Sequence, residues 1–250
     1  MLGIIDHGNI REIRLARPPV NALNPELLSA VRDAVRAAAT DGAHGIVLSG
    51  GPKVFSAGLD LLHLIGLERE PLRDAWTVFF EAARAIADSP IPVAAAIGGH
   101  SPAGGCVLAL CCDYRVMADG PFRIGLNEVE VGLVVPEGIQ YLMTRLIGTA
   151  RAERLLVSGA MIEARRALEL GLVDELSDPE TVGECARNWL GELLTRPTEA
   201  MLATRAIVRS DLCAALADPD RIRLECFLDA WFQPPTQAAL RAVVARLKGG

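Results

Sequence analysis

At 250 residues, with 51% hydrophobic and 22% charged residues, the chain has enough apolar material for one large domain or two small ones. This composition excludes a disordered chain, a collagen and a coiled-coil rod. The formal net charge of −6 disfavours binding to nucleic acid or to an anionic membrane, so we expect a soluble, mildly acidic protein with neither partner.

The first 130 residues show the patterns of alternating strands and helices. A hairpin is expected at residues 3–16, with its turn at Gly8-Asn9. Asn24 followed by Pro25 predicts the start of a helix, because an Asn side chain caps free N–H groups and proline suits the first helical turn. The further elements expected here are a strand at 46–49, a helix at 72–88, a buried strand at 91–97, a helix at 104–112 and a strand at 114–118.

Helices dominate the chain from Glu137 onward, and Leu172–Leu176 is the only late strand expected. Helical patterns cover 138–147, 150–157, 162–170 and 181–194, and three further helices, separated by Pro197, Pro219 and Pro234-Pro235, are expected before the C-terminus. We therefore divide the chain into an α/β core at residues 1–194, which would hold the active site, and a helical region at 195–250. The size of the helical region requires it to pack on another structure.

The stretch from Ser89 to Cys112 carries no Asp, Glu, Lys or Arg and is long enough to cross a bilayer. Its prolines and glycines favour a buried strand, a loop and a buried helix instead. No targeting leader is recognisable before the first strand, so we expect a cytoplasmic location.

The cysteines and histidines do not form a recognisable metal motif. No two cysteines have C-x-x-C spacing, and three of them lie in an apolar run, so buried free thiols are expected rather than zinc ligands or disulfides. The four histidines share no ligand spacing, and no metal is expected. The cysteines are Cys106, Cys111, Cys112, Cys185, Cys213 and Cys226.

Two glycine-bearing turns and one acidic residue are the candidate functional features. The first glycine turn, Phe55–Asp60, and the second, Ser101–Cys106, each lead from a strand into a helix. Small residues there let the backbone approach a ligand, and free N–H groups at a helix start can bind an oxyanion. Glu128 ends the apolar run Ile124–Glu128. From these residues alone, each turn could equally be an ordinary tight turn and Glu128 a solvated loop carboxylate.

These segments resemble the crotonase superfamily, the enoyl-CoA hydratases and isomerases. The segment PPVNALN at residues 18–24 resembles the opening signature of this superfamily, and the resemblance extends from about Pro18 to Leu176. Within the superfamily, the chain most resembles the mitochondrial-type Δ3,Δ2-enoyl-CoA isomerases. Four segments carry this resemblance: SAGLDL (56–61), PAGGC (102–106), CDYR (112–115) and IGLNE (124–128). The resemblance implies an α/β fold, a crotonase-type spiral of β-β-α units, with a helical C-terminal region that forms homotrimers or dimers of trimers.

The resemblance also implies catalytic roles for Leu59, Gly104 and Glu128. The backbone N–H groups of Leu59 and Gly104 would hold the thioester oxygen, and Glu128 would be the base. The hydratases carry a second glutamate where this chain has Val107. Hydration needs two carboxylates, whereas a double-bond shift needs only one. We therefore expect a Δ3,Δ2-enoyl-CoA isomerase of fatty-acid β-oxidation, with a coenzyme A thioester as substrate and no other cofactor.

The expected contacts with coenzyme A involve Ala57, Lys53 and Ser56. The Ala57 carbonyl would meet the adenine, and Lys53 a phosphate, although a solvated lysine is equally consistent with the sequence. The acyl pocket is expected to include Leu62, Val107 and Leu126, with Leu61 and Leu64 as further candidates or plain core residues.

Three other acidic residues are expected to have structural roles. Asp60 would cap a helix or orient a neighbouring group, and Asp113 would pair at a helix end. Glu137 would begin a helix, with a place in the pocket lining as the alternative. Two alternative functions stay open. One is another acyl-CoA conversion, by a thioesterase, a decarboxylase or a weak hydratase. The other is a non-catalytic relative that binds RNA, which the acidic charge and the presence of only two lysines disfavour.

Overall fold

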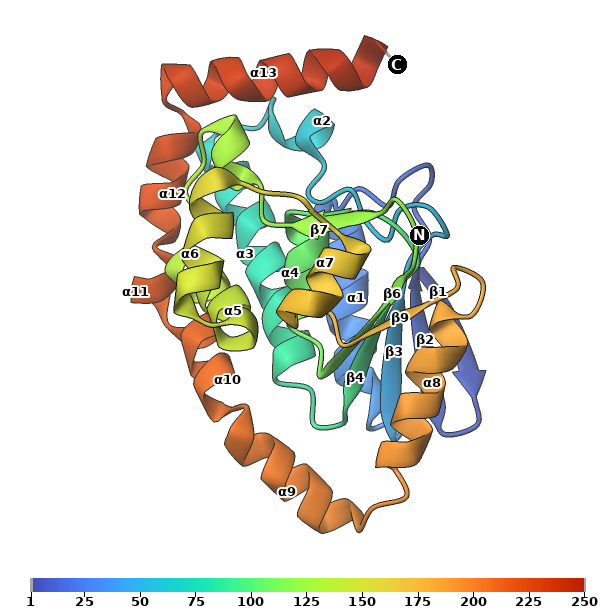
Figure 1. The fold of residues 1–250 in the computed structure, drawn as a ribbon. Coiled ribbons are helices and arrows are strands. Elements are labelled where there is room, and N and C mark those ends of the chain that lie inside the picture. Colours follow the sequence, from blue (N-terminus) through green and yellow to red (C-terminus); the bar gives the residue numbers. More distant parts are fainter. Residues whose placement is uncertain (1, 250) are drawn as a thin grey trace.

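The computed structural model describes residues 2–249, and its main sheet has six strands in the order β1-β2-β3-β4-β6-β9 (Figure 1). The hairpin is confirmed: β1 and β2 are antiparallel and turn at Gly8, whose φ is +66°. Every other neighbouring pair in this sheet is parallel. The strands are β1 (Leu2–His7), β2 (Ile10–Leu15), β3 (Gly45–Ser49), β4 (Val93–Ile97), β6 (Tyr114–Ala118) and β9 (Glu175–Ser177).

The central strands β3 and β4 are buried on both faces, which explains why they are apolar without alternation. In β4, Ala95 and Ile97 join the core formed with α1 (Pro25–Ala38) and α3 (Arg69–Ala87), whereas Ala94 and Ala96 face α8 (Val182–Leu193). The start of α1 is as expected, because the Asn24 side chain accepts a hydrogen bond from the Leu27 N–H (3.1 Å).

A second, small sheet follows the order β5-β7-β8 and was not expected from the sequence. Its strands are β5 (Ser101–Pro102), β7 (Arg123–Gly125) and β8 (Ile162–Glu163), each too short to leave a periodic signal. Helices α4 (Gly104–Leu110) and α7 (Ala164–Leu170) pack on this sheet. The remaining elements of this part of the chain are α2 (Leu61–Leu64), the 3-10 turn η1 (Glu128–Val131), α5 (Glu137–Ile147) and α6 (Thr149–Ser158).

The late strand expected at Leu172–Leu176 is displaced towards the C-terminus. Gly171, with a φ of +78°, ends α7, and Leu172 and Val173 are buried in the core before the chain pairs with β6 at β9. The position of the strand depends on this long-range pairing rather than on the apolar residues that precede it.

Residues 195–249 contain five helices, so the expectation of three in the C-terminal region was wrong. Proline marks the starts of α9, α11 and α13 as expected, but Arg209 separates α9 from α10, and Arg223, with a φ of +49°, separates α11 from α12. Neither arginine is a recognisable breaker in the sequence. The helices are α9 (Thr198–Val208), α10 (Ser210–Ala217), α11 (Pro219–Ile222), α12 (Leu224–Trp231) and α13 (Pro234–Gly249).

These five helices wrap around one side of the core (Figure 1). Helices α10 and α12 pack on α3, α10 and α11 pack on α5, and α13 crosses over α2 and η1. The division at residue 194 falls just after α8, although residues 1 and 250 of the two expected units lie outside the described residues. The oligomerisation role expected of this region stays a prediction.

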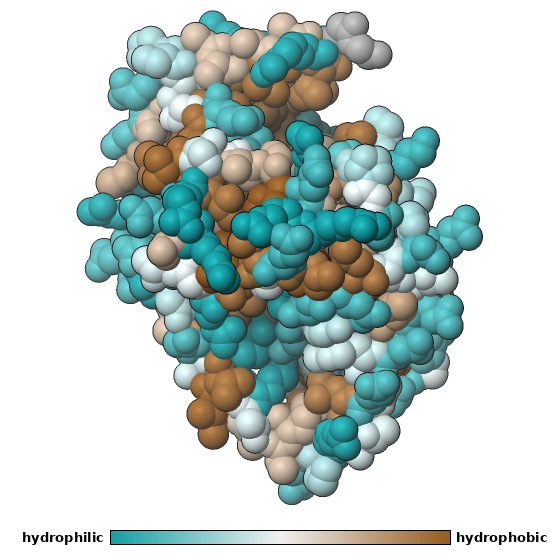
Figure 2. All heavy atoms as spheres, in the orientation of Figure 1, coloured by the Kyte–Doolittle hydropathy of each residue, from teal (hydrophilic) through white to brown (hydrophobic). Residues whose placement is uncertain are grey.

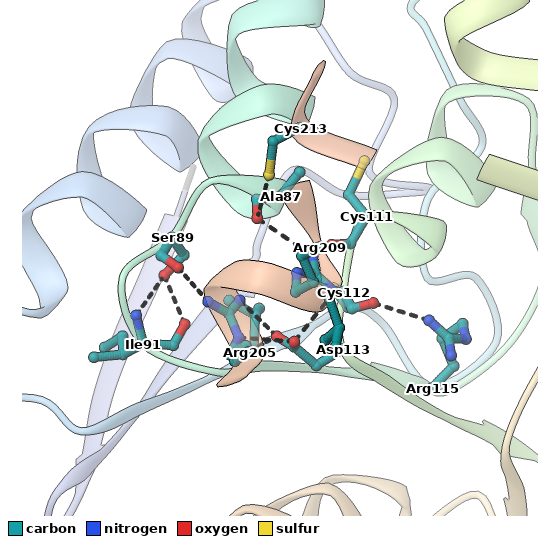
Figure 3. A network of polar contacts seen from close by, with 12 residues as sticks. Ala87, Ser89, Ile91, Cys111, Cys112, Asp113, Arg115, Arg205, Arg209 and Cys213 are labelled. Atoms are coloured by element: carbon teal, nitrogen blue, oxygen red, sulfur yellow. Dashed lines mark hydrogen bonds and ion pairs between the residues drawn. The ribbon is translucent and has the colours of Figure 1, made fainter. Parts of the chain in front are cut away.

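Helix α9 is fastened to the core by two arginines (Figure 3). Arg205 forms an ion pair with Asp113 and donates to the Ser89 carbonyl, and Arg209 pairs with the same Asp113 carboxylate and donates to the Cys111 carbonyl. Asp113 also accepts from the Val93 N–H. The structural role expected of Asp113 is therefore confirmed.

Candidate active site

The two glycine turns lie against each other, backbone to backbone. Val54 and His100 pair as in a parallel sheet, and the Phe55 N–H donates to the His100 carbonyl (2.9 Å). A Cβ on Gly105 would lie 2.7 Å from the Ser56 carbonyl oxygen. A Cβ on Gly58 would lie 3.2 Å from the Pro102 carbonyl oxygen, and Gly58 has a φ of +82°. The turns can meet only because these positions lack side chains.

The backbone N–H groups of Leu59 and Gly104 are both free at this meeting point. On either side of Leu59, the Leu23 N–H donates to the Gly58 carbonyl (2.8 Å) and the Asp60 N–H donates to the Leu23 carbonyl (3.0 Å). Within residues 2–249, the Leu59 and Gly104 N–H groups themselves donate to no protein atom. A Cβ on Gly104 would lie 3.5 Å from Leu59 Cγ, so the two residues are neighbours.

Ala103 holds a strained backbone conformation directly before Gly104, at φ +45° and ψ −120°. A non-glycine residue in such a region carries about 1–3 kcal/mol of strain and is typical of functional sites. The Ala103 N–H donates to the Gly125 carbonyl (2.8 Å), and the ψ of Ala103 sets the plane of the peptide that contains the Gly104 N–H. The motif PAGGC includes Ala103, but nothing in the sequence indicated this conformation.

Glu128 lies beside the second glycine turn because β5 and β7 run parallel, with Pro102 opposite Gly125. The carboxyl ends of both strands therefore meet at one edge, where β5 continues into Gly104 and β7 into Glu128. Glu128 is close enough to Cys106, in the first turn of α4, that its charge contributes to raising the pKa of that thiol, after burial.

The Glu128 carboxylate is poised to gain or lose a proton near neutral pH. Its Oε2 atom is buried and has no hydrogen-bond partner among the described residues. Burial raises the pKa of Glu128 to about 7, partly opposed by a hydrogen bond from its own backbone N–H. The solvated loop carboxylate left open by the sequence is thus not what the structure contains.

Asn21 supports the first glycine turn, and its part in the site was missed in the sequence. The residue is buried in the left-handed region, with a φ of +50°. Its side chain donates to the Phe55 carbonyl (3.0 Å) and accepts from the Arg17 N–H (2.9 Å), while its own carbonyl accepts from the Ser56 hydroxyl (2.8 Å). The family-like segment PPVNALN was the available signal, and an Asn that tolerates this φ explains one of its positions.

This chain is similar in sequence and in structure to known proteins. The profile of the enoyl-CoA hydratase/isomerase family matches residues 6–239. The chain belongs to this family. Mouse enoyl-CoA delta isomerase 1, a mitochondrial protein, is 34% identical over 244 residues, covering 96% of this chain and 84% of the relative.

An isomerase and a probable hydratase of the enoyl-CoA hydratase/isomerase family are both similar to this chain. The crystal structure of human mitochondrial delta3-delta2-enoyl-CoA isomerase has a TM-score of 0.94 at 30% identity, covering 99% of this chain and 98% of that chain. The probable enoyl-CoA hydratase EchA17 of Mycobacterium tuberculosis is 34% identical over 215 residues, covering 84% of this chain and 80% of the relative. The crotonase fold and the resemblance stated from the motifs are confirmed.

Several residues expected to bind the substrate have well-defined environments in this family member. Val107 and Leu126 are each only 1% exposed and belong to the main core, whereas Leu62 is 48% exposed. Lys53 and Ala57 are exposed on the loop that carries the first glycine turn. Their contacts with coenzyme A or an acyl chain stay predictions.

Ser56 and the acidic candidates serve the framework of the site. The Ser56 hydroxyl accepts from the Gly58 N–H (3.2 Å) and so shapes the first glycine turn; its expected contact with coenzyme A stays a prediction. Asp60 caps α2 and forms an ion pair with Arg17 (2.6 Å), which confirms its expected role. Glu137 begins α5 as expected, and its exposed side chain pairs with Arg221 (2.8 Å).

The described part of the chain lacks the arrangements that a metal site or a membrane-spanning helix would require. Residues 2–249 contain no group of three or more His, Cys, Asp or Glu side chains arranged to hold a metal ion. No helix in the same range has the length and apolar character needed to cross a membrane. Cys106, Cys111 and Cys112 are buried free thiols, as expected.

Proposed function

We propose that this protein is a Δ3,Δ2-enoyl-CoA isomerase, which converts 3-enoyl-CoA to trans-2-enoyl-CoA in fatty-acid β-oxidation. The observation that carries the proposal is the placement of one buried carboxylate, Glu128, beside two free backbone N–H groups, those of Leu59 and Gly104. The names of the mouse and human relatives agree with this activity.

The proposed reaction moves one proton and one double bond. The Glu128 carboxylate removes a proton from C2 of the substrate, and the electron pair of that C–H bond delocalises as a dienolate onto the thioester oxygen. The Leu59 and Gly104 N–H groups hold this oxygen, each contributing on the order of 3–4 kcal/mol to transition-state stabilisation. Protonated Glu128 then returns the proton to C4, which leaves the double bond between C2 and C3.

The pKa of Glu128 suits both halves of this shuttle. A base whose pKa is about 7 is substantially ionised at neutral pH and still donates its proton readily after it has become protonated. A solvated glutamate, near its ordinary pKa of 4.5, would be a weaker base towards the C2 proton.

Val107 favours isomerisation over hydration. A hydratase needs a second carboxylate to activate water, and at this position the chain has an apolar side chain that is 1% exposed and packed in the core. The similarity to a probable hydratase keeps a weak hydratase, a thioesterase and a decarboxylase as alternative acyl-CoA enzymes. RNA binding is the least favoured alternative, because of the net charge of −6.

The deciding experiment mixes the purified full chain with a trans-3-enoyl-CoA and follows the ultraviolet absorbance of the conjugated 2-enoyl thioester. We expect a rise that stops at equilibrium with no change in product mass. Glu128→Gln should lose at least about a thousandfold in rate, while Glu130→Gln, on the exposed side of the same turn, should keep wild-type activity.

Each alternative has its own signature in the same reaction mixture. A product heavier by one water indicates a hydratase, a free acid a thioesterase, and loss of carbon dioxide a decarboxylase. If none of these products forms and RNA binds in a salt-sensitive manner, the protein is a non-catalytic relative.

We further propose that the protein is a homotrimer or dimer of trimers located in the cytoplasm. Ile207 and Val208, near the end of α9, are 74% and 57% exposed, and Figure 2 shows hydrophobic residues low on this face, in the region of α9 and α10. Burying them between subunits would remove apolar surface from water. Sedimentation equilibrium tests the assembly, and a monomer would contradict it; cell fractionation tests the location.

A further inference from the structure

Helix α13 reaches the turn that carries Glu128 through a polar contact. Thr236, near the start of α13, is only 5% exposed, and its hydroxyl donates to the carbonyl oxygen of Gly132 (Oγ1 to O, 3.1 Å). Gly132 is the residue that ends η1, in the left-handed region at φ +76°. The contact joins parts of the chain 104 residues apart.

The same peptide unit links Thr236 to Glu128. The Gly132 carbonyl and the Leu133 N–H belong to one planar peptide group, so the orientation of one fixes the other. The Leu133 N–H donates to the Glu128 carbonyl (3.1 Å). A hydrogen bond from Thr236 on one side of this peptide therefore holds the hydrogen bond that closes the turn around Glu128.

Close packing leaves the turn little room to adopt another conformation. A Cβ on Gly132 would lie 3.2 Å from Thr236 Oγ1 and 3.4 Å from Thr236 Cα. A second contact comes from α6, where a Cβ on its terminal Gly159 would lie 2.8 Å from Val129 Cγ2. Helix α13 therefore touches the backbone of the turn at Gly132, and the end of α6 touches the Val129 side chain of the same turn.

Helix α13 also packs on α2, which begins two residues after Leu59 (Figure 1). One C-terminal helix thus contacts both the turn that carries the base and the helix that follows the first glycine turn. We propose that Thr236 is a positioning residue for Glu128, acting through the Gly132–Leu133 peptide as a latch between α13 and the active site. This inference rests on the proposed function of Glu128 as the base.

Loss of the Thr236 hydroxyl should loosen the turn without removing any group that touches the substrate. The Glu128 carboxylate would then sample orientations further from C2 and more exposed to water. Increased hydration favours the charged form, so its pKa should move down from about 7 towards the ordinary value. The catalytic step should therefore weaken while binding of the coenzyme A portion is kept.

The test compares Thr236→Val, which keeps the shape and removes the hydroxyl, with Thr236→Ser, which restores it. We expect Thr236→Val to lower kcat about tenfold with KM changed less than about twofold, and to shift the pH midpoint of kcat to lower pH. Thr236→Ser should restore most of kcat and most of the pH midpoint. Thr195→Val is the matched control, since Thr195 makes an exposed hydroxyl-to-carbonyl bond to Glu192 (2.7 Å) outside the site.

A second readout does not depend on turnover. Hydrogen exchange of the Leu133 amide should be faster in Thr236→Val than in wild type and in Thr195→Val. If Thr236→Val keeps the kcat, the pH profile and the Leu133 exchange rate of the wild type, Thr236 is not a positioning residue, even if the protein is an isomerase. If the wild-type protein has no isomerase activity but its Leu133 exchange still depends on Thr236, the proposed function is wrong, whereas the Thr236–Gly132 hydrogen bond is supported.

Discussion

Arg205 of α9 and Asp113, which lies directly before β6, form a two-pronged ion pair across 92 residues of sequence, with Nε–Oδ1 and Nη2–Oδ2 distances of 2.8 Å each. Both side chains are 11% exposed. Arg209 adds a third contact to the same carboxylate (Nη1 to Oδ1, 3.1 Å) and is itself buried. The negative charge of one aspartate is thus paired with two largely buried guanidinium groups, which join the C-terminal helices to the core (Figure 3).

Removing the charge of Asp113 should leave these two arginines without an anionic partner. Breaking a buried ion pair on one side costs about 3–5 kcal/mol, because the remaining charge stays buried. We expect Asp113→Asn to lower the free energy of unfolding by about this amount in urea titrations. Asp33→Asn removes the exposed pair with Arg32 and should cost less than about 1 kcal/mol. Equal effects of the two substitutions would refute a special role for the α9 anchor.

Asn21→Ala should weaken the first glycine turn. The change leaves the Phe55 carbonyl and the Arg17 N–H without their side-chain partner and places alanine at a φ of +50°. Together these effects should lower the free energy of unfolding by about 2–4 kcal/mol and reduce kcat/KM, because the Leu59 N–H loses its fixed position. Asn9→Ala, which removes only an exposed contact to His44, is the control. Wild-type stability of Asn21→Ala would show that the turn holds itself.

The pH dependence of the reaction should report the ionisation of Glu128. Only the carboxylate form can remove the C2 proton, so kcat/KM should rise with pH and level off above a midpoint of about 7. Initial rates of double-bond shift between about pH 5 and about pH 9 measure this curve. A midpoint near 4.5, the ordinary value, would mean that Glu128 is solvated in the working enzyme.

Glu128 should also make the protein less stable as the pH rises. Burial raises its pKa in the folded state to about 7 from an ordinary value of 4.5, so between these two values the folded protein binds more protons than the unfolded chain. The stabilisation from the protonated form is therefore complete below about 4.5 and is lost as the pH increases through about 7.

Glu128→Gln should reverse that loss, because glutamine resembles the protonated carboxyl group and does not ionise. Above pH 8 the variant should be more stable than wild type by about 3 kcal/mol, and near pH 4 the two should unfold alike. Thermal unfolding at both values measures the difference, with Glu130→Gln as the exposed control. A variant that is less stable than wild type at high pH would contradict a carboxylate whose ionised form is disfavoured by burial.

Local signals in the sequence were sufficient for much of the framework. Asn24 and Pro25 placed the start of α1, because capping involves only neighbouring residues. The prolines placed the starts of α9, α11 and α13 for the same reason. The two glycine turns and Glu128 could be selected because their motifs are short, continuous segments of the chain.

The roles of the residues that support the site could not be found in this way. Asn21, Ala103 and Thr236 act through partners that only folding brings near, at Phe55, Gly125 and Gly132 respectively. At the break between α9 and α10, Arg209 contacts Asp113 and the Cys111 carbonyl, and no helix-ending residue marks this position in the sequence.

The amino-acid order thus specifies which groups are available: a carboxylate at 128, glycines at 104 and 105, and valine at 107. The tertiary structure decides what those groups can do. Glu128 becomes a base with a pKa of about 7 only because the fold buries its carboxylate near Cys106, and removal from water disfavours its charged form.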